Sequence, residues 1–394
     1  MKYIVLLADG MGDVPVEELG GKTPLEVANT PNMDALFAKS MAGLVHPLVD
    51  GFPLGSDVGN MTMLGNNPHD HYTGRAPMEA ANLGIVLGPK DVAFRCNLVY
   101  VKAGKMIDYS SGHITTEESK VLIKMLDKKF GNDEIKFYPG KSYRHIMVIK
   151  GGETIKATPP HDITGLEIEP YMPKGAKADL LKRLMTDSAY LLDGHEINMQ
   201  RRAEGKNPAN MIWLWGQGKK LDLPHMKDKY NLKGAVISAV DLVNGIGVSM
   251  GLDIINVPGV TGYIDTNFAG KAEYALKTLK KKDFVYLHVE ATDEMGHNKD
   301  IKGKILAIEK FDSEIVSRII EGMKEFGDYR IMITSDHATP VKAGTHTDDA
   351  VPFMIYDSAK VEDMLSVKYS EKTAAERKIE YKNGWELFDF FIKK

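Results

Sequence analysis

Several features that define other protein classes are missing from this chain of 394 residues. It contains one cysteine, Cys96, so no disulfide can form within the chain, and we expect Cys96 to be a small buried hydrophobe. The longest apolar region, around residues 236–260, is interrupted by Asp241, Asn244 and Asp253, which excludes a membrane span there. The apolar run at residues 3–8 is too short for a signal peptide. These absences predict a soluble protein of the reducing cytoplasm.

An excess of one charge is also missing. Lys and Arg together number 50 and Asp and Glu 54, a formal net charge of −4, which gives no reason to expect a nucleic-acid or membrane partner. Internal repeats and low-complexity tracts are absent as well. With 43% hydrophobic and 26% charged residues, the composition is that of an ordinary globular protein, long enough for two or three domains or for one that carries an insertion. The oligomeric state is unknown from the sequence.

The apolar runs are distributed in two different ways along the chain. Residues 3–8 form a continuous apolar run, typical of a strand buried on both faces of a parallel sheet, and strands alternate with helices again after residue 210. Residues 211–215 are expected to belong to that sheet and residues 302–325 to form one long helix. Between these regions the pattern is α+β. The sequence predicts an α/β fold with a mostly parallel central sheet and helices on both faces. We expect a metal-binding domain from residues 1–67 and 208–394, and an inserted substrate-binding cap at 68–207.

Acids and imidazoles follow the apolar runs. Asp9 ends the first run, the Asp-x-x-x-His pair Asp293 and His297 follows residues 284–289, and a third strand ends in Asp336 and His337. His346 lies nine residues after His337. Ligands collect at the carboxyl ends of strands in such sheets, and mixed oxygen and nitrogen donors suit divalent cations. Taken singly each group also fits a polar turn; together they predict two neighbouring cation sites.

Ser56 adds a candidate nucleophile. It follows Gly55 at the predicted start of a helix, where free N–H groups favour an anion, although a serine there is also a common helix cap. Two-cation sites suit in-line phosphoryl displacement, and a cation would lower the pKa of a serine hydroxyl. The combination predicts metal-dependent phosphoryl transfer.

The insertion contributes candidates for gripping a phosphorylated acid and for moving protons. Guanidinium groups bind phosphate and carboxylate in a bidentate manner, and histidine or aspartate can carry the proton of a hydroxyl. An isolated arginine is, however, more often a surface charge. We favour Arg75, His113, His161 and Asp162, which lie in Gly/Pro/Ser-rich loops. The candidates for substrate binding are Arg75, His113, His161, Arg144 and Arg201, with Asp162 as a catalytic proton carrier and Arg95, Arg202 and His145 as further possibilities.

These motifs resemble those of the alkaline-phosphatase superfamily and, within it, the cofactor-independent (2,3-bisphosphoglycerate-independent) phosphoglycerate mutases of the archaeal type. The resemblance covers essentially the whole chain. Its residues are Ala8-Asp-Gly-Met-Gly-Asp13, Gly55-Ser-Asp-Val-Gly-Asn60, Asp293-x-x-x-His297, Ser335-Asp-His337, Thr345-His346, Gly74–Glu79, Phe94–Asn97, Asn207–Asn210 and Asp349–Phe353.

The resemblance implies two divalent ions, expected to be manganese, with zinc, magnesium or cobalt as alternatives, and no 2,3-bisphosphoglycerate cofactor. It implies that Ser56 becomes a phosphoserine while 3-phosphoglycerate and 2-phosphoglycerate interconvert. One ion would be held by Asp293, His297 and His346, and the other by Asp9, Ser56, Asp336 and His337.

One segment departs from the archaeal pattern. Between Met106 and Thr116 those mutases carry an arginine-rich stretch, whereas this chain has Met-Ile-Asp-Tyr-Ser-Ser-Gly-His-Ile. The variant resembles a bacterial subgroup proposed to act as homoserine kinases, which would use the same serine and metals with a nucleoside triphosphate. A phosphate-ester hydrolase is a further alternative. The absence of a Walker-type phosphate loop does not decide among them.

Overall fold

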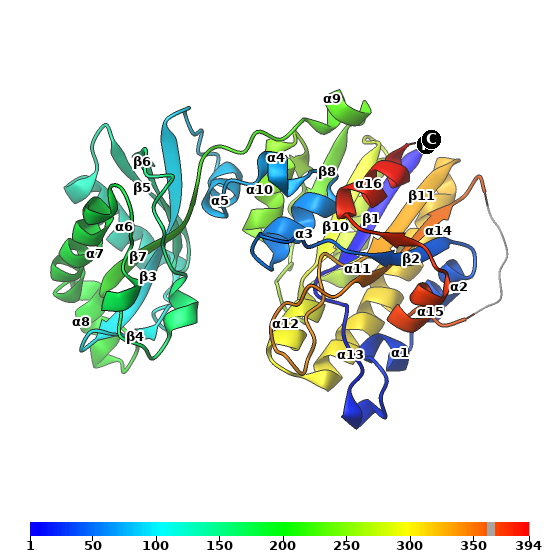
Figure 1. The fold of residues 1–394 in the computed structure, drawn as a ribbon, viewed down its shortest axis with the longest axis horizontal. Helices are drawn as coiled ribbons and strands as arrows, with labels where there is room; N and C mark the ends of the chain where they lie inside the picture. The colour runs from blue at the N-terminus through cyan, green and yellow to red at the C-terminus, as the bar shows by residue number, and fades with distance from the viewer. Residues whose placement is uncertain (361–366, 394) are drawn as a thin grey trace. The chain divides into compact units, whose positions relative to one another are not determined.

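The computed structural model describes residues 1–360 and 367–393, and the chain divides into two compact units (Figure 1). The outer unit contains residues 1–72 and 222–394, and the inserted unit contains residues 73–221.

The outer unit is built on an eight-stranded sheet in the order β13-β2-β12-β11-β1-β10-β8-β9. Every neighbouring pair is parallel except those of β12, which runs antiparallel to both β11 and β2. The central strand β1 is buried on both faces, as the continuous apolar run predicts. The strands are β1 (Lys2–Ala8), β2 (Met41–Val45), β8 (Gly234–Ile237), β9 (Asp253–Ile254), β10 (Phe284–Val289), β11 (Tyr329–Thr334), β12 (Val351–Asp357) and β13 (Glu380–Tyr381).

Helices cover both faces of this sheet (Figure 1). On one face Ile4 and Leu6 of β1 join a core with residues of α2, α11, α13 and α14. On the other face α3 and α16 pack together, and the ring of Tyr3 meets that of Phe391 edge to face at 5.7 Å. The α-helices of this unit are α1 (Pro24–Val27), α2 (Pro31–Phe37), α3 (Ser56–Met63), α4 (Pro68–His71), α9 (Met226–Tyr230), α10 (Asp241–Ser249), α11 (Phe268–Leu279), α12 (Ala291–His297), α13 (Ile301–Lys310), α14 (Ser317–Met323), α15 (Glu371–Glu376) and α16 (Gly384–Ile392). The predicted α/β class is confirmed.

The long helix expected at residues 302–325 is interrupted. A π-helical segment, Phe311–Val316, lies between α13 and α14. Its buried Asp312 accepts hydrogen bonds from the backbone N–H of Met33 at 2.6 Å and the side-chain amide of Asn32 at 2.7 Å, at the start of α2. Apolar periodicity could not reveal this wider turn, because its Asp312 contacts the start of a helix that lies 280 residues away in sequence.

The inserted unit contains a five-stranded antiparallel sheet in which β3 pairs with β4, β6 and β7. The expectation that residues 211–215 belong to the parallel sheet is wrong: they lie in β7, which pairs with β3 from Ala93 to Val99. The chain therefore leaves this unit after residue 221, later than the boundary expected at 207/208, and enters it at residue 73 rather than 68. Its elements are α5 (Ala76–Asn82), β3 (Asp91–Lys102), β4 (Lys105–Asp108), α6 (Thr116–Phe130), β5 (Ile135–Lys141), β6 (Arg144–Lys150), α7 (Ala178–Asp193), α8 (Glu196–Ala203) and β7 (Met211–Gly218).

The two ends of the inserted unit lie side by side. The Thr73 hydroxyl donates to the carbonyl of Lys219 at 2.6 Å. Gly74 has φ +138°, and a Cβ atom there would lie 1.9 Å from the carbonyl oxygen of Gln217. Only glycine permits this approach of the two backbones.

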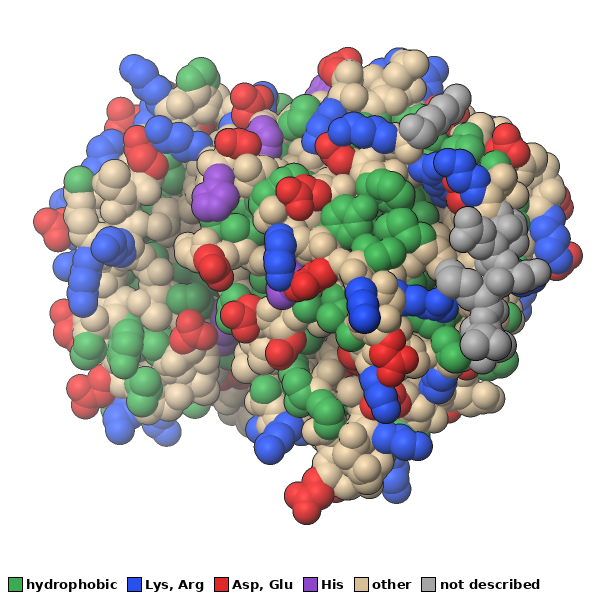
Figure 2. All heavy atoms as spheres, turned by 45° about the vertical axis from the view of Figure 1, so that its right-hand side comes forward, with side chains coloured by type: hydrophobic (Ala, Val, Ile, Leu, Met, Phe, Trp, Pro, Cys, Tyr) green, Lys and Arg blue, Asp and Glu red, His purple; other side chains and the backbone are tan. Residues whose placement is uncertain are grey.

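On the face drawn in Figure 2, basic and acidic side chains are interspersed rather than gathered by sign, in keeping with the balanced composition. Among the described residues, no helix is both long and apolar enough to cross a membrane.

Candidate metal centre

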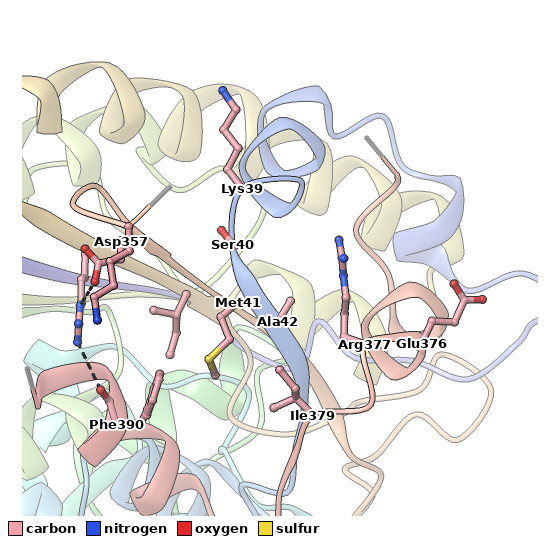
Figure 3. A pocket seen from close by; sticks show the side chains of 12 residues that line it. Lys39, Ser40, Met41, Ala42, Asp357, Glu376, Arg377, Ile379 and Phe390 are labelled. Atoms are coloured by element: carbon pink, nitrogen blue, oxygen red, sulfur yellow. Dashed lines mark hydrogen bonds and ion pairs between the residues drawn. The ribbon is translucent and has the colours of Figure 1, made fainter. Parts of the chain in front are cut away.

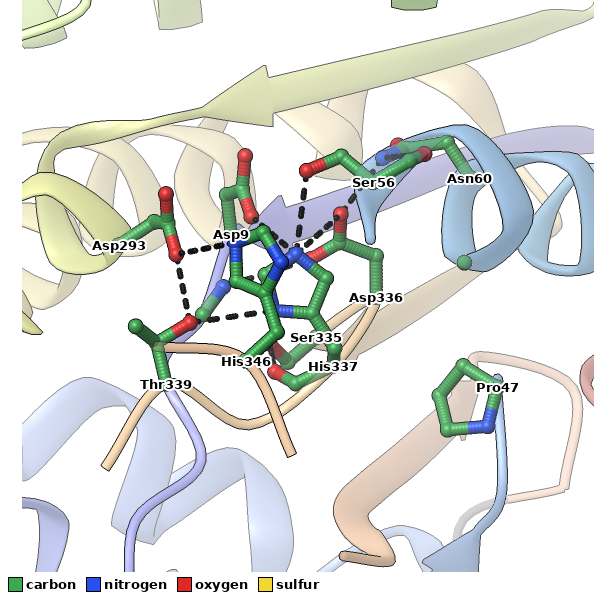
Figure 4. A network of polar contacts seen from close by, with 12 residues as sticks. Asp9, Pro47, Ser56, Asn60, Asp293, Ser335, Asp336, His337, Thr339 and His346 are labelled. Carbon is green, nitrogen blue, oxygen red and sulfur yellow. Dashed lines mark hydrogen bonds and ion pairs between the residues drawn. The ribbon is translucent and has the colours of Figure 1, made fainter. Parts of the chain in front are cut away.

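The acids and imidazoles predicted from the strand ends converge in the outer unit, at the carboxyl edge of the parallel strands (Figure 4). The loops after β1 and β11 carry three of them, α12 carries two, and the loop before β12 carries one. Ser56 is the first residue of α3. The seven residues brought together are Asp9, Ser56, Asp293, His297, Asp336, His337 and His346.

One half of the cluster is built around Asp293. Its carboxylate lies 3.2 Å from His297 Nε2 and 3.6 Å from His346 Nε2, and it accepts a hydrogen bond from the Thr339 hydroxyl at 2.5 Å. The Nε2 atoms of the two histidines are 3.0 Å apart. Their Nδ1 atoms lie 3.1 Å and 3.0 Å from the carbonyls of Gly344 and Leu54. Since Nδ1 must donate to a carbonyl, loss of the Nε2 proton would leave both Nε2 lone pairs to face a common cation.

The other half contains the two most deeply buried acids. Asp9 Oδ1 lies 3.3 Å and Asp336 Oδ2 lies 3.5 Å from His337 Nε2. The Ser56 hydroxyl is 3.1 Å from the same nitrogen. Asp336 is held by the Asn60 side-chain amide at 2.6 Å. The hydroxyl at the start of α3 therefore faces a group of acid and imidazole ligands.

Burial makes it energetically unfavourable for all three carboxylates to be ionised unless positive charge lies beside them. Burial and the nearby carboxylates of Asp336 and Asp293 raise the pKa of Asp9 well above its usual range. Burial alone would raise the pKa of Asp293, but hydrogen bonds from His297 and His346 lower it well below that range. The same contact with Asp293 raises the pKa of His297 to about 9. A divalent cation would replace the protons that this cluster otherwise has to bind, so the donor set fits divalent metal.

Two close backbone approaches allow the convergence. Gly59 lets α3 pack against the loop after β11, since a Cβ atom there would lie 2.2 Å from the carbonyl oxygen of Asp336. Gly10 has φ +60°, and a Cβ atom there would lie 2.6 Å from Asp293 Oδ1. Space therefore requires both glycines, and the left-handed backbone of Gly10 is a second reason for glycine there.

A buried ion pair, which sequence reasoning missed, fastens the ligand loops to each other. Lys304 of α13 donates to Asp13 Oδ2 at 2.7 Å, to the carbonyl of Thr339 at 2.8 Å and to that of Gly12 at 3.2 Å. Both charged side chains are fully buried. The loop that carries Asp9 is thereby fixed to the loop that carries the ligands after β11.

His288 is a second residue that was missed. It lies in β10 with no exposed surface, and its Nε2 is 3.1 Å from Asp9 Oδ2. One potential ligand atom from each of His288, Asp9 and Asp336 lies within 4.8 Å of the other two. Within the sequence it is one polar residue in an apolar run, and only its position next to the strand end could have drawn attention to it.

In the inserted unit, three of the candidate arginines belong to one charged cluster. Arg75 Nε and Arg95 Nε lie 3.5 Å and 3.2 Å from the two oxygens of Glu79. The guanidinium of Arg95 stacks over the ring of Trp215 at 4.3 Å. Burial lowers the pKa of Arg95, and the nearby charges of Arg75 and Arg144 lower it further, to about 10. Two guanidinium groups around one carboxylate, with the charge of Arg144 nearby, leave a net positive charge that suits an anion.

His161 and Asp162 lie beside this cluster. The ring of His161 is 5.3 Å from that of Trp215, and its Nε2 is 3.6 Å from Asp162 Oδ1. Burial lowers the pKa of His161, Asp162 opposes this, and Arg95 and Arg75 lower it further. The imidazole is therefore neutral near pH 7 and able to exchange a proton.

The remaining two candidates have other surroundings. Arg201 is buried and donates to Glu118 at 2.8 Å, to the Ser111 carbonyl at 2.6 Å and to the Asn207 carbonyl at 3.0 Å. These bonds hold the loop at residues 108–113 in place, a structural role rather than the expected grip on substrate. His113 is exposed, with φ +49°, 6.1 Å from the ring of Tyr143.

A cavity of about 590 Å³ lies elsewhere on the outer unit, beside β2, β11 and α16 (Figure 3). Its buried Arg330 donates to Asp357 at 2.8 Å and to the carbonyl of Phe391 at 3.0 Å. Arg330 stands near the amino end of β11, whereas Asp336 follows its carboxyl end. The cavity therefore lies away from the ligand cluster, and none of the expected site residues line it.

The fold and the ligand cluster define a class of α/β enzymes whose sheet presents acids and imidazoles suited to divalent cations at its carboxyl edge. A cofactor-independent phosphoglycerate mutase from Thermoplasma acidophilum has the same fold, with a TM-score of 0.67 at 24% identity over 100% of this chain and 99% of that one. A protein from Pyrococcus horikoshii gives a TM-score of 0.82 at 29% identity, over 99% and 97% of the two chains.

Sequence relatives identify the family. Residues 38–198 match the family model described as 2,3-bisphosphoglycerate-independent phosphoglycerate mutase. A protein of that name from Methanosarcina barkeri is 47% identical over 100% of both chains. A probable enzyme of the same kind from Geobacter sulfurreducens is 48% identical, again over 100% of both. The chain belongs to the 2,3-bisphosphoglycerate-independent phosphoglycerate mutase family, as its motifs predict.

Proposed function

We propose that this enzyme interconverts 3-phosphoglycerate and 2-phosphoglycerate through a phosphoserine at Ser56, with two divalent cations, of which manganese is our first choice. The observation that carries the proposal is the position of the Ser56 hydroxyl. It stands at the amino end of α3, 3.1 Å from His337 Nε2, in a cluster of three buried acids and three imidazoles. The full-length relatives that carry the mutase name support the substrate.

The proposed reaction forms and breaks one phosphorus–oxygen bond in each of two steps. The Ser56 oxygen attacks the phosphorus of 3-phosphoglycerate, and the C3 oxygen leaves with a proton. The C2 hydroxyl of the bound glycerate then attacks the phosphoserine, gives up its proton, and returns Ser56 to its hydroxyl form. Cations bound by the acids and imidazoles would stabilise negative charge on the transferring oxygens. The free N–H groups at the start of α3 favour the same charge.

The inserted unit would supply the groups that recognise an acid. Arg75, Arg95 and Arg144 carry the positive charge for a carboxylate or phosphate. The neighbouring pair His161 and Asp162 is proposed to carry the proton of the glycerate hydroxyls. This assignment favours the cluster around Glu79 over the loop at residues 108–113.

The second candidate is a phosphotransferase of the homoserine kinase type. It is favoured by one feature of the inserted unit: the loop at residues 108–113 contains no arginine, and the nearby Arg201 is used within the protein. Such an enzyme would use Ser56 and the same cations with phosphate from ATP.

One experiment separates the candidates. The protein is stripped with chelator, reloaded with manganese, and mixed with 3-phosphoglycerate without 2,3-bisphosphoglycerate, while the products are followed by ³¹P NMR. Metal-dependent formation of 2-phosphoglycerate is expected. Free phosphate alone would indicate a hydrolase. Inactivity on 3-phosphoglycerate, with ADP formed only when homoserine and ATP are present, would replace the mutase by the kinase.

A further inference from the structure

His288 has a geometry that the seven predicted ligands do not explain. Its ring lies in the interior of the outer unit, and its Nε2 is 3.1 Å from Asp9 Oδ2. Neither this nitrogen nor Asp9 Oδ1 forms a hydrogen bond with any of the described residues. Two buried polar atoms that form no hydrogen bond with the described residues therefore face the position where Asp9 and Asp336 converge.

The other ring nitrogen of His288, Nδ1, is in contact with a serine hydroxyl. His288 Nδ1 lies 3.2 Å from the hydroxyl oxygen of Ser238, in the loop after β8. That oxygen accepts the backbone N–H of Val240 at 3.0 Å and retains a second lone pair. If Nδ1–H donates to Ser238, the Nε2 lone pair points at the two acids. A metal-bound histidine is oriented in this way, through a hydrogen bond from its other nitrogen.

The main chain at His288 is fixed as well. Its carbonyl accepts a hydrogen bond from Lys271 Nζ at 2.7 Å, and Lys271 is itself fully buried in α11. The backbone of His288 is therefore held by α11, and the contact of Nδ1 with Ser238 orients the ring. The opposite proton arrangement, in which Nε2–H donates to Asp9, would make His288 a positioning residue instead.

We propose that His288 Nε2 is a direct ligand of the cation that Asp9 and Asp336 hold. This inference rests on the proposed function for the existence of that cation and adds a donor to its coordination shell. Ser56 and His337 would complete a shell of five donors, two of them imidazoles. Such a shell disfavours magnesium, which prefers oxygen ligands, relative to the transition metals.

The proton on the ring decides between the two roles. In zinc-loaded protein with ¹⁵N-labelled histidine, the expected ¹H–¹⁵N spectrum shows a protonated Nδ1 and a metal-bound Nε2 for His288. The signals are assigned from contacts of the ring with β1, so no variant is required. A protonated Nε2 in the loaded protein would overturn the proposal.

Metal affinity gives a second readout. His288→Gln keeps a side chain of similar reach that can still hydrogen-bond Asp9 but removes the imidazole. Manganese titration by calorimetry should show one of two equivalents weakened by at least about tenfold and the other unchanged. His225→Gln, which removes an exposed imidazole of the outer unit, is the control and should bind as the parent does.

The two proposals fail in different ways. If the parent protein binds fewer than two equivalents of manganese, the two-cation site of the proposed function is wrong, and the ligand role of His288 falls with it. If the parent binds two equivalents and His288→Gln binds both with unchanged affinity, only the ligand role of His288 is wrong.

Discussion

The two units gather ionisable side chains of opposite charge: acids in the outer unit and arginines in the inserted unit. In the outer unit Asp9, Asp293 and Asp336 gather with imidazoles, whereas in the inserted unit Arg75 and Arg95 gather around Glu79. The acids lack enough positive charge of their own, so they are suited to cations taken from solution. The guanidiniums are permanently charged and are suited to an anion. One cluster should therefore depend on metal and the other should not.

The largest effect that tests this division is expected for Ser56→Ala. Loss of the proposed nucleophile should lower the rate of phosphoryl transfer by at least about 10⁴-fold, because the proposed phosphoserine can no longer form. The measurement is 2-phosphoglycerate formation at saturating manganese. Ser249→Ala, which removes another hydroxyl on a helix of the same unit, should retain full activity. Substantial activity in Ser56→Ala would exclude the covalent route.

Lys304→Met should produce the largest loss of stability. The variant leaves Asp13 charged and buried without its partner, which costs about 3–5 kcal/mol. In a Trp385→Phe background the remaining tryptophans, Trp213 and Trp215, both lie in β7 and report on the inserted unit alone.

Circular dichroism should then show earlier unfolding of the outer unit, while the fluorescence transition stays in place. Lys302→Met, at an exposed position of the same helix, is the matched control. Equal shifts of both transitions would show that the two units unfold together rather than independently.

A buried acid of the outer unit should make the stability of the protein depend on pH. Burial raises the pKa of Glu371 from 4.5 to about 7. The folded protein therefore holds a proton that the unfolded chain has released, and stability falls as pH rises from about 4.5 to about 7, then levels off. The loss is at most about 3 kcal/mol.

Thermal melts of metal-free protein between pH 5 and pH 8 measure this slope. Glu371→Gln should flatten it and should be more stable than the parent at pH 8. Glu376→Gln changes an exposed carboxylate of the same helix and should leave the slope unchanged. An identical slope in Glu371→Gln would assign the pH dependence to another group.

The smallest effect is expected in the inserted unit. Arg95→Lys keeps the charge but loses the planar stack on Trp215 and the fork that faces Glu79. We expect kcat/KM to fall by about 10-fold to 100-fold, mainly through KM, with two manganese ions still bound. Arg202→Lys alters an exposed pair with Asp193 and should be neutral. A loss of manganese in Arg95→Lys would contradict the division between the units.

The strand ends were the most predictable part of the molecule. An apolar run that stops at an acid has one simple physical reading in an α/β sheet, so the convergence of Asp9, Asp293 and Asp336 follows from sequence order alone. His288 gave no such signal, because it lies inside an apolar run and its partners come from other strands.

Contacts between distant segments explain the other differences. Residues 211–215 form an apolar run before a glycine-rich turn, which fits either sheet, and only pairing with β3 decides between them. Likewise Arg201 looks like a substrate ligand until its contacts with Glu118 and Ser111 are known. Pairing partners and the use of each donor depend on tertiary structure, which local pattern does not contain.

The hydrogen bond between Thr73 and Lys219 closes the inserted unit where the chain enters and leaves it. Lengthening, shortening or replacing what lies between these two residues leaves every strand of the metal-binding sheet with its neighbours. Recombination at this junction would exchange the whole inserted unit without altering any of the seven residues that converge in the outer unit.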